Sequence, residues 1–256
     1  MKNKAICITA GEQSENHSGM EINGNGLASE GFTIEDLLKY KDLLEIKEIR
    51  CEYYRLDECV EDKTNVAPAG LLIIRNGVKG LIDEDPSNML VEQLRYKWDM
   101  KYWDTRRKRV LNLRARYNVC YGNEGQEPNY EEKKGTIISY TQTPILEKWR
   151  KSLEIIFGEK CVNLEVEGNY YYNTDKCGIG FHGDAERKKV IACSLGTSRP
   201  IHWQWYHYSK PIGERFKLTL NSGDMYIMSE KTTGYDWKLR SKKTLRHAAG
   251  EKYVNK

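Results

Sequence analysis

Residues 172–187 read YNTDKCGIGFHGDAER, and at their centre His182 and Asp184 are separated by a single glycine. In an extended strand, side chains two positions apart leave the same face. An imidazole and a carboxylate at this spacing can therefore hold one metal ion. Two histidines and one carboxylate with open coordination positions are typical of non-haem iron(II) sites. The stretch predicts two of the three ligands of such a site.

The sequence around this pair has a distinctive order. Tyrosines and a Gly178-Ile179-Gly180 turn precede the pair, and Glu186, an apolar strand and Ser194-Leu195-Gly196 follow it. In this order the chain resembles the AlkB-like branch of the iron(II)- and 2-oxoglutarate-dependent dioxygenases. The resemblance covers roughly residues 110–254, and its other motifs are Arg116-Tyr117-Asn118, PILEKW at 144–149 and GDMYIM at 223–228. It implies iron(II), with 2-oxoglutarate and O2 as co-substrates.

The part of the chain after residue 136 has the pattern of a β-rich domain. Apolar residues at helical spacing predict a helix over 145–157 that ends at Gly158. Short strands separated by Gly and Asn are predicted at 163–166, 168–173, 180–182, 190–195, 201–208, 216–220, 224–228 and 252–254. This pattern favours a mainly β fold with flanking helices, built on a double-stranded β-helix, or jelly-roll, core over residues 101–256.

The first hundred residues lie outside most of this resemblance. We predict a strand at 5–9, a loop at 11–26, a helix from a Thr33 cap to about Tyr40, strands at 46–56 and 69–74, a hairpin turn at Asn76-Gly77 and a helix at 89–98. Residues 1–100 are expected to form an α+β N-terminal extension of unknown role. They could be a small separate module or an elaboration of the outer wall of the core.

Composition narrows the class of protein. The 256 residues are 39% hydrophobic and 30% charged, and no apolar run approaches the length of a membrane span. The seven cysteines are scattered without a CxxC pair, which favours a reducing compartment over a disulfide framework or a zinc site. We expect an intracellular protein, cytoplasmic or nuclear and not secreted, with no membrane partner and a monomeric state favoured.

The third metal ligand must come from a later histidine. His202, His207 and His247 follow Asp184, and the spacing of five places the first two on opposite faces of one strand. In the resembled family the third ligand comes after the Gly-Asp strand, which implies His247. The family's Trp-x-His would lie closer to that strand, but this chain has Leu239 there, after Trp237. The alternative is that His247 is a core or surface histidine.

The resemblance also implies residues that bind 2-oxoglutarate. The family places an arginine after the third ligand, but no arginine follows His247. Lys252 is expected to take its place, because a lysine can act as a point charge where arginine would fork, and Arg246 is the second candidate. Tyr172 matches the family tyrosine that contacts the co-substrate, with Tyr170 at the family's asparagine position. The alternatives are a solvated Lys252 and tyrosines that only pack in the strand.

A basic and aromatic segment spans residues 96–117. Its charged residues are Lys101, Arg106, Arg107, Lys108, Arg109, Arg114 and Arg116, with tyrosine and tryptophan between them. This mixture suits a polyanion whose bases stack on rings, or else a solvated amphipathic helix. The resemblance implies a substrate lid here, with Arg107, Arg109, Tyr121 and Tyr130 near the substrate. Glu186 and Arg187 are also expected beside the substrate; Glu186 would accept from a base amino group, or pair with Arg187 or Lys188.

These observations predict an iron(II)- and 2-oxoglutarate-dependent dioxygenase, an oxidoreductase that demethylates alkylated nucleobases in DNA or RNA, as in DNA repair. Such an enzyme must take the base out of its stack. Two other reactions use the same metal site: hydroxylation of a pyrimidine methyl group and hydroxylation of a protein side chain. A fourth alternative is a nucleic-acid-binding protein with a degenerate metal site.

Overall fold

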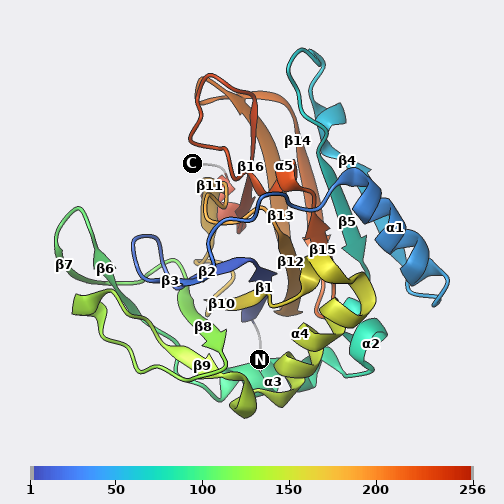
Figure 1. Cartoon of the computed structure of the whole chain (residues 1–256). Coiled ribbons are helices and arrows are strands. Elements are labelled where there is room, and N and C mark those ends of the chain that lie inside the picture. Colours follow the sequence, from blue (N-terminus) through green and yellow to red (C-terminus); the bar gives the residue numbers. More distant parts are fainter. Residues whose placement is uncertain (1–2, 255–256) are drawn as a thin grey trace.

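The computed structural model describes residues 3–254 and is mainly β, with one large and one smaller antiparallel sheet (Figure 1). The large sheet has the order β4-β5-β15-β12-β1-β10-β8-β9, in which only β8 and β9 pair in parallel. Its strands are β1 (Ala5–Gly11), β4 (Cys51–Arg55), β5 (Gly70–Ile74), β8 (Tyr117–Gly122), β9 (Ile137–Ser139), β10 (Glu165–Tyr171), β12 (Val190–Gly196) and β15 (Met225–Met228).

The smaller sheet has the order β11-β16-β13-β14. Its strands are β11 (Ile179–His182), β13 (Arg199–His207), β14 (Lys210–Leu220) and β16 (Thr244–Ala249). Two hairpins stand apart from both sheets: β2 (Gln13–Glu15) with β3 (Ile22–Gly24), and β6 (Lys101–Asp104) with β7 (Arg109–Asn112).

Within residues 3–254, six α-helices and four short 3-10 helices connect these strands. The α-helices are α1 (Ile34–Glu45), α2 (Gly77–Ile82), α3 (Pro86–Leu94), α4 (Pro144–Phe157), α5 (Glu230–Thr233) and α6 (Glu251–Val254). The 3-10 helices are η1 (Leu56–Cys59), η2 (Tyr130–Glu132), η3 (Tyr140–Gln142) and η4 (Glu159–Cys161). No helix within residues 3–254 is long and apolar enough to cross a membrane.

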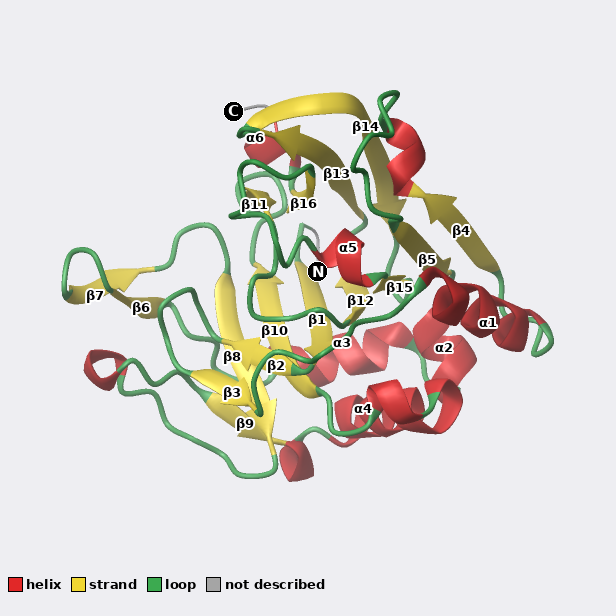
Figure 2. Ribbon diagram, turned by 45° about the horizontal axis from the view of Figure 1, so that its top comes forward, coloured by secondary structure: helices red, strands yellow, loops and turns green. Residues whose placement is uncertain are grey.

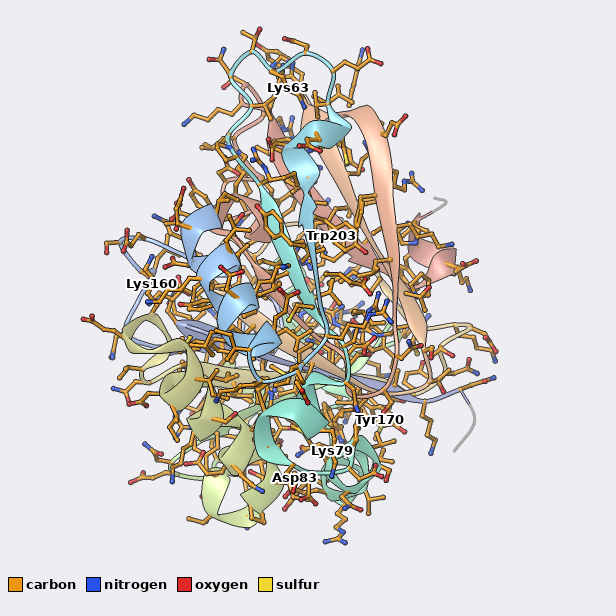
Figure 3. The ribbon with its side chains drawn as sticks, turned by 90° about the vertical axis from the view of Figure 1, so that its right-hand side faces the viewer. Lys63, Lys79, Asp83, Lys160, Tyr170 and Trp203 are labelled. Carbon is orange, nitrogen blue, oxygen red and sulfur yellow. The ribbon has the colours of Figure 1, made fainter. Side chains whose placement is uncertain are left out.

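The large sheet is covered on both faces. Helices α1–α4 lie on one face (Figure 2), where Ile6 and Ile8 of β1 belong to the same core as Trp149 of α4. On the other face, Ala5 and Cys7 belong to a second core with Trp203 of the smaller sheet, which lies among the strands in Figure 3. Because both faces of β1 are buried, its sequence is a continuous apolar run rather than an alternating one.

Strand β1 lies in the interior of the large sheet, between β10 and β12. It pairs antiparallel with both, so that Cys7 faces Asn169 on one side and Ser194 on the other. Strands β4 and β5 extend the same sheet beyond β15. Strands within residues 5–74 therefore share one sheet with strands within residues 117–228.

Side chains satisfy the N–H groups at the starts of α1 and α4. Thr33 caps α1 as the sequence predicts, and with Asp36 it forms a capping box; the helix runs to Glu45, beyond the predicted end at about Tyr40. The buried Glu92 carboxylate accepts hydrogen bonds from the N–H groups of Ile145 and Leu146 in the first turn of α4. Lys160 ties η4 to α1 through an ion pair of 2.7 Å with Asp36 (Figure 3).

Several predictions of secondary structure are wrong in detail. Asn76 does not form a hairpin turn: it adopts φ 49° and begins α2. Residues 252–254 belong to a helix rather than to a last strand. The predicted loop at 11–26 contains the β2–β3 hairpin, and the predicted strand at 46–56 begins only at Cys51, because residues after α1 form a turn with Glu48 at φ 59°.

Candidate metal centre

Three side chains converge at one point between the two sheets: His182 at the end of β11, Asp184 in the loop that follows, and His247 in β16. Their possible ligand atoms all lie within 4.8 Å of one another. Asp184 Oδ1 is 3.7 Å from His182 Nε2 and 3.6 Å from His247 Nε2. The two histidines meet because β11 and β16 pair with His182 opposite His247. The structure thus brings together the three predicted ligands.

The backbone around Asp184 fixes the position of its carboxylate. The Asp184 N–H donates to the Thr233 carbonyl at 3.0 Å. A Cβ atom at Gly183 would lie 2.0 Å from the Gly234 carbonyl oxygen, so only glycine allows this close approach. The turn after α5 therefore holds the loop in which Asp184 follows His182.

The protonation states of the ligands suit a cation. His182 Nδ1 lies 2.8 Å from the Gly180 carbonyl, and a proton donated there leaves Nε2 free to coordinate. Burial, together with the neighbouring His247, lowers the pKa of His182 to about 3. Burial would raise the pKa of Asp184, but the attraction and hydrogen bond of His247 outweigh it and lower that pKa. A neutral imidazole and an ionised carboxylate are the forms that bind metal, so this donor set fits iron(II).

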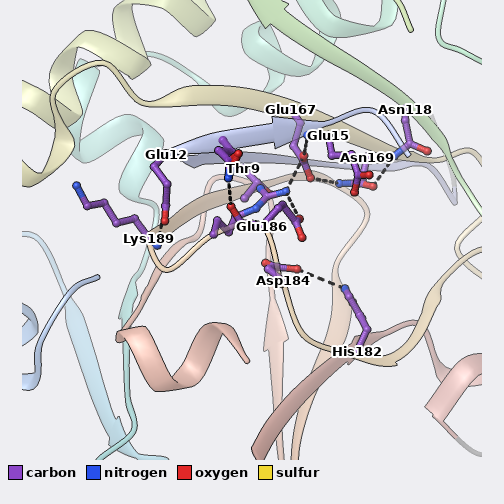
Figure 4. Close-up of polar contacts among 12 residues, drawn as sticks. Thr9, Glu12, Glu15, Asn118, Glu167, Asn169, His182, Asp184, Glu186 and Lys189 are labelled. Atoms are coloured by element: carbon purple, nitrogen blue, oxygen red, sulfur yellow. Dashed lines mark hydrogen bonds and ion pairs between the residues drawn. The ribbon is translucent and has the colours of Figure 1, made fainter. Parts of the chain in front are cut away.

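The three ligands line a cavity of about 780 Å³. Near them, Glu15, Glu167 and Glu186 gather toward β1 and β10 (Figure 4). Arg187 is 2% exposed, and its Nη2 lies 2.7 Å from Glu167 Oε2 and 2.8 Å from Glu186 Oε1. Burial raises the pKa of Glu15 to about 7, against the lowering effect of a hydrogen bond from the Gly19 N–H. This wall therefore carries more carboxylates than cations.

Arg199 also lines the cavity, on the first residue of β13. It is 4% exposed, and its guanidinium stacks 4.3 Å from the centre of the Tyr171 ring. Its Nε and Nη1 have no hydrogen-bond partner within residues 3–254. A buried cation without a counter-ion is costly, so this arrangement suits an anionic ligand. The sequence prediction missed Arg199, because it precedes His247 in the chain instead of following it.

The predicted co-substrate residues lie elsewhere. Lys252 is exposed on α6 and Arg246 lies between the rings of Tyr206 and Trp237, at 4.1 and 5.3 Å. Tyr172 donates its hydroxyl to the Arg114 carbonyl at 2.7 Å. None of the three is among the described residues that line the cavity.

The neighbouring residue Tyr171 does line the cavity, together with Asn169. An asparagine and a tyrosine two positions apart therefore line the cavity, one position earlier than the Tyr170 and Tyr172 of the sequence prediction. Asn169 is held in place because its Oδ1 accepts from Arg116 Nε at 2.6 Å and from Asn118 Nδ2 at 2.7 Å. The Asn169-Tyr170-Tyr171 pattern in the sequence is the signal that could have identified both residues.

The predicted substrate residues divide into two groups. Glu186 and Arg187 line the cavity, and they pair with each other. Tyr121 is buried in the core and donates to Gln93 Oε1 at 2.6 Å, while Tyr130 donates to Asp99 at 2.8 Å. Arg107 and Arg109 are exposed on the β6–β7 hairpin. None of these last four is among the cavity-lining residues of the described chain.

The basic segment forms the β6–β7 hairpin rather than an amphipathic helix, and the hairpin projects from the body of the molecule (Figure 1). It contacts the rim of the cavity through Tyr102, whose ring lies 4.0 Å from that of His17. His17 itself lines the cavity, and burial lowers its pKa to about 4. A molecule bound along the hairpin would therefore lie next to the cavity mouth.

Comparison with known proteins gives a relative but no activity. No protein-family model matches the sequence. The chain is 42% identical over 256 residues to the uncharacterized protein R156 of Acanthamoeba polyphaga mimivirus, an alignment that covers 98% of each protein. At that identity and coverage, the chain belongs to the same family as this mimivirus protein.

Proposed function

We propose that this protein is an iron(II)- and 2-oxoglutarate-dependent dioxygenase of the AlkB-like type that oxidises alkylated nucleobases in DNA or RNA. The observation that carries the proposal is the convergence of His182, Asp184 and His247 on one wall of a cavity. Two imidazoles and one carboxylate leave coordination positions open for a co-substrate and O2. Iron(II) held there would supply oxygen activation and the oxidation of a C–H bond.

The strand order supports a jelly roll as the finer description of the fold. From β10 to β16 the chain alternates between the large and the smaller sheet, with only the β13–β14 hairpin staying in one of them. We propose that β1 fills the position beside β10 and β12 that a strand after β16 would otherwise occupy. This arrangement explains why no arginine follows His247: helix α6 stands where the sequence predicted that strand.

Arg199 is the proposed anchor for the distal carboxylate of 2-oxoglutarate. Its guanidinium is buried, lines the cavity and has two nitrogens without partners among the described residues. A planar guanidinium can bind a carboxylate through two parallel hydrogen bonds. The guanidinium stacks on the Tyr171 ring, and Asn169 lines the same cavity. Arg199 thus takes the role first assigned to Lys252 or Arg246.

The acidic wall and the basic hairpin support a nucleic-acid substrate. Glu186 offers a carboxylate that can accept from the amino group of a base, and Glu15 offers another nearby. The exposed arginines of the β6–β7 hairpin, including Arg107 and Arg109, can contact phosphates beside the cavity mouth. The chain would then hold the strand outside and one extruded base inside.

The test is mass spectrometry of methylated oligonucleotides after incubation with the purified protein, iron(II) and 2-oxoglutarate. With wild-type protein we expect a demethylated oligonucleotide and succinate. We expect neither product with His182→Ala or Asp184→Ala. His202→Ala is the matched control, because His202 is buried but is not among the cavity-lining residues described. Formation of succinate with a hydroxymethyl group retained on the base would indicate pyrimidine methyl hydroxylation instead. Oligonucleotide binding without succinate would indicate a binding protein.

A further inference from the structure

We infer that Arg187 is a positioning residue for the metal centre, which ties the loop carrying Asp184 to strand β10. The inference rests on the proposed metal site. One guanidinium nitrogen, Nη2, lies 2.7 Å from Glu167 in β10 and 2.8 Å from Glu186 in the loop. The same group thus bridges a central strand of the large sheet and the segment that supplies the carboxylate ligand.

A movement of Arg187 would be passed directly to Asp184. The Arg187 N–H donates to the Asp184 carbonyl at 3.2 Å, which closes a tight turn over residues 184–187. The backbone of this segment is held by the Asp184 N–H, which donates to Thr233, by Gln13 Nε2, which donates to the Glu186 carbonyl at 2.7 Å, and by the N–H groups of Lys188 and Lys189, which donate to Glu12. The guanidinium adds the side-chain constraint that joins the turn to β10.

The stem of Arg187 is also fixed. Its side chain is 3% exposed, and a Cβ atom added at Gly11 would lie 3.1 Å from its Cδ, so the stem runs closely past the end of β1. A buried ion pair contributes little net stability, because the desolvation of the charges offsets their attraction. The geometry therefore points to positioning of the loop rather than to stabilisation of the fold.

The experiment is a Co(II) titration of the full-length, metal-free protein, followed by visible absorption in the absence of O2 and co-substrate. We expect Arg187→Met to weaken Co(II) binding about 10- to 100-fold and to change the absorption bands, because the carboxylate ligand is no longer held in place. Arg187→Lys should recover part of the affinity, since lysine keeps the charge but makes a single point contact.

Arg75 provides a matched control. It also bridges two carboxylates, with Nη2 2.8 Å from Glu52 and Nη1 2.8 Å from Asp224, but it is not among the described residues that line the cavity. Arg75→Met should lower the stability of the fold and leave Co(II) affinity and absorption unchanged. A purely structural role of Arg187 would give the same result as Arg75.

The inference is overturned if folded Arg187→Met binds Co(II) within about twofold of wild type with unchanged absorption bands. If Arg187→Met does not fold, the double variant Arg187→Met/Glu167→Gln is tested instead, because it removes one of the carboxylates that would be left unpaired. The same limits on Co(II) affinity and absorption then decide the inference. A wild type that binds Co(II) but forms no succinate from 2-oxoglutarate contradicts the proposed function alone. A wild type that binds no Co(II) overturns both.

Discussion

The cavity has two chemically different regions. Around the metal centre, Asp184 lies within 4 Å of two histidines, so each ligand already has a neighbour of complementary charge or polarity. Around Arg199, the side chains of Cys7, Tyr171 and Tyr226 come from three other strands, and the guanidinium has unpaired nitrogens in the described chain. The first region is a preformed set of donors for a cation, whereas the second is a cation that lacks an anion. The two regions therefore suit ligands of opposite charge, and their residues come from different parts of the chain.

The largest expected effect comes from removing a metal ligand. His247→Ala should weaken Co(II) or iron(II) binding by at least about 100-fold, because it removes one of three protein donors. Isothermal titration with the metal-free protein measures this change. His202→Ala should keep wild-type affinity, since His202 lies on the same sheet but outside the cavity lining described. Retained metal binding in His247→Ala would show that another group supplies the third donor.

Removal of the anion anchor should have the next largest effect. Arg199→Met should weaken 2-oxoglutarate binding to the Mn(II)-loaded protein about 10- to 100-fold, the effect of losing charged hydrogen bonds. Without co-substrate, the melting temperature should stay constant or rise, because a buried unpaired charge is removed. Titration calorimetry and thermal unfolding measure the two quantities.

Arg246→Met is the control for Arg199. Arg246 lies between Tyr206 and Trp237, so its loss should reduce stability through lost stacking and leave 2-oxoglutarate affinity unchanged. The assignment of Arg199 would be contradicted if Arg199→Met melted several degrees lower than wild type and bound 2-oxoglutarate normally.

The two regions also differ in how far the sequence predicts them. His182 and Asp184 lie two positions apart, and a local spacing rule is enough to place them on one face. Arg199 reaches the cavity only because β13, which it begins, pairs with β16, the strand that carries His247. No local pattern records that long-range pairing. The prediction therefore sought a cation after His247, where the structure has helix α6 instead of a strand.

The sequence prediction also misplaced the cavity tyrosine by one residue. The sequence prediction chose Tyr172, but successive side chains of a strand point to opposite faces, and Tyr171 is the one that lines the cavity. By contrast, α4 and the Thr33 cap of α1 were predicted correctly, because helical periodicity and caps depend on nearby residues. Local elements were predictable, while strand order and strand face were not.

The basic hairpin should contribute a moderate effect that neither region of the cavity accounts for. Arg107→Gln combined with Arg109→Gln should weaken binding of a single-stranded oligonucleotide several-fold and reduce the salt dependence by roughly 0.7 per lost phosphate contact. Fluorescence anisotropy across a salt series measures both. Lys39→Gln with Lys47→Gln removes the same charge from exposed positions near α1 and should change neither quantity. Equal losses from both pairs would indicate a non-specific charge effect.

The smallest expected effect concerns the acidic wall near the metal. With a folded pKa of about 7 and an ordinary value of 4.5, Glu15 keeps its proton in the folded chain where the unfolded chain has lost it. The folded state then binds more protons between these values, so the free energy of unfolding should fall as pH rises from about 4.5 to 7. Because Glu15 is only partly buried, we expect Glu15→Gln to remove about 1 kcal/mol of this decline.

Urea unfolding of the metal-free protein at several pH values in this window measures the slope. Glu58→Gln, at an exposed position in η1, should leave it as in wild type. Loss of the slope in Glu15→Gln would show that the carboxylates near Arg187 outnumber their cations in the folded chain, so that a cationic or donor-rich group is favoured beside the metal. An unchanged slope would mean that solvent or neighbouring charges already compensate Glu15, and the wall would then be no more acidic than the cavity as a whole.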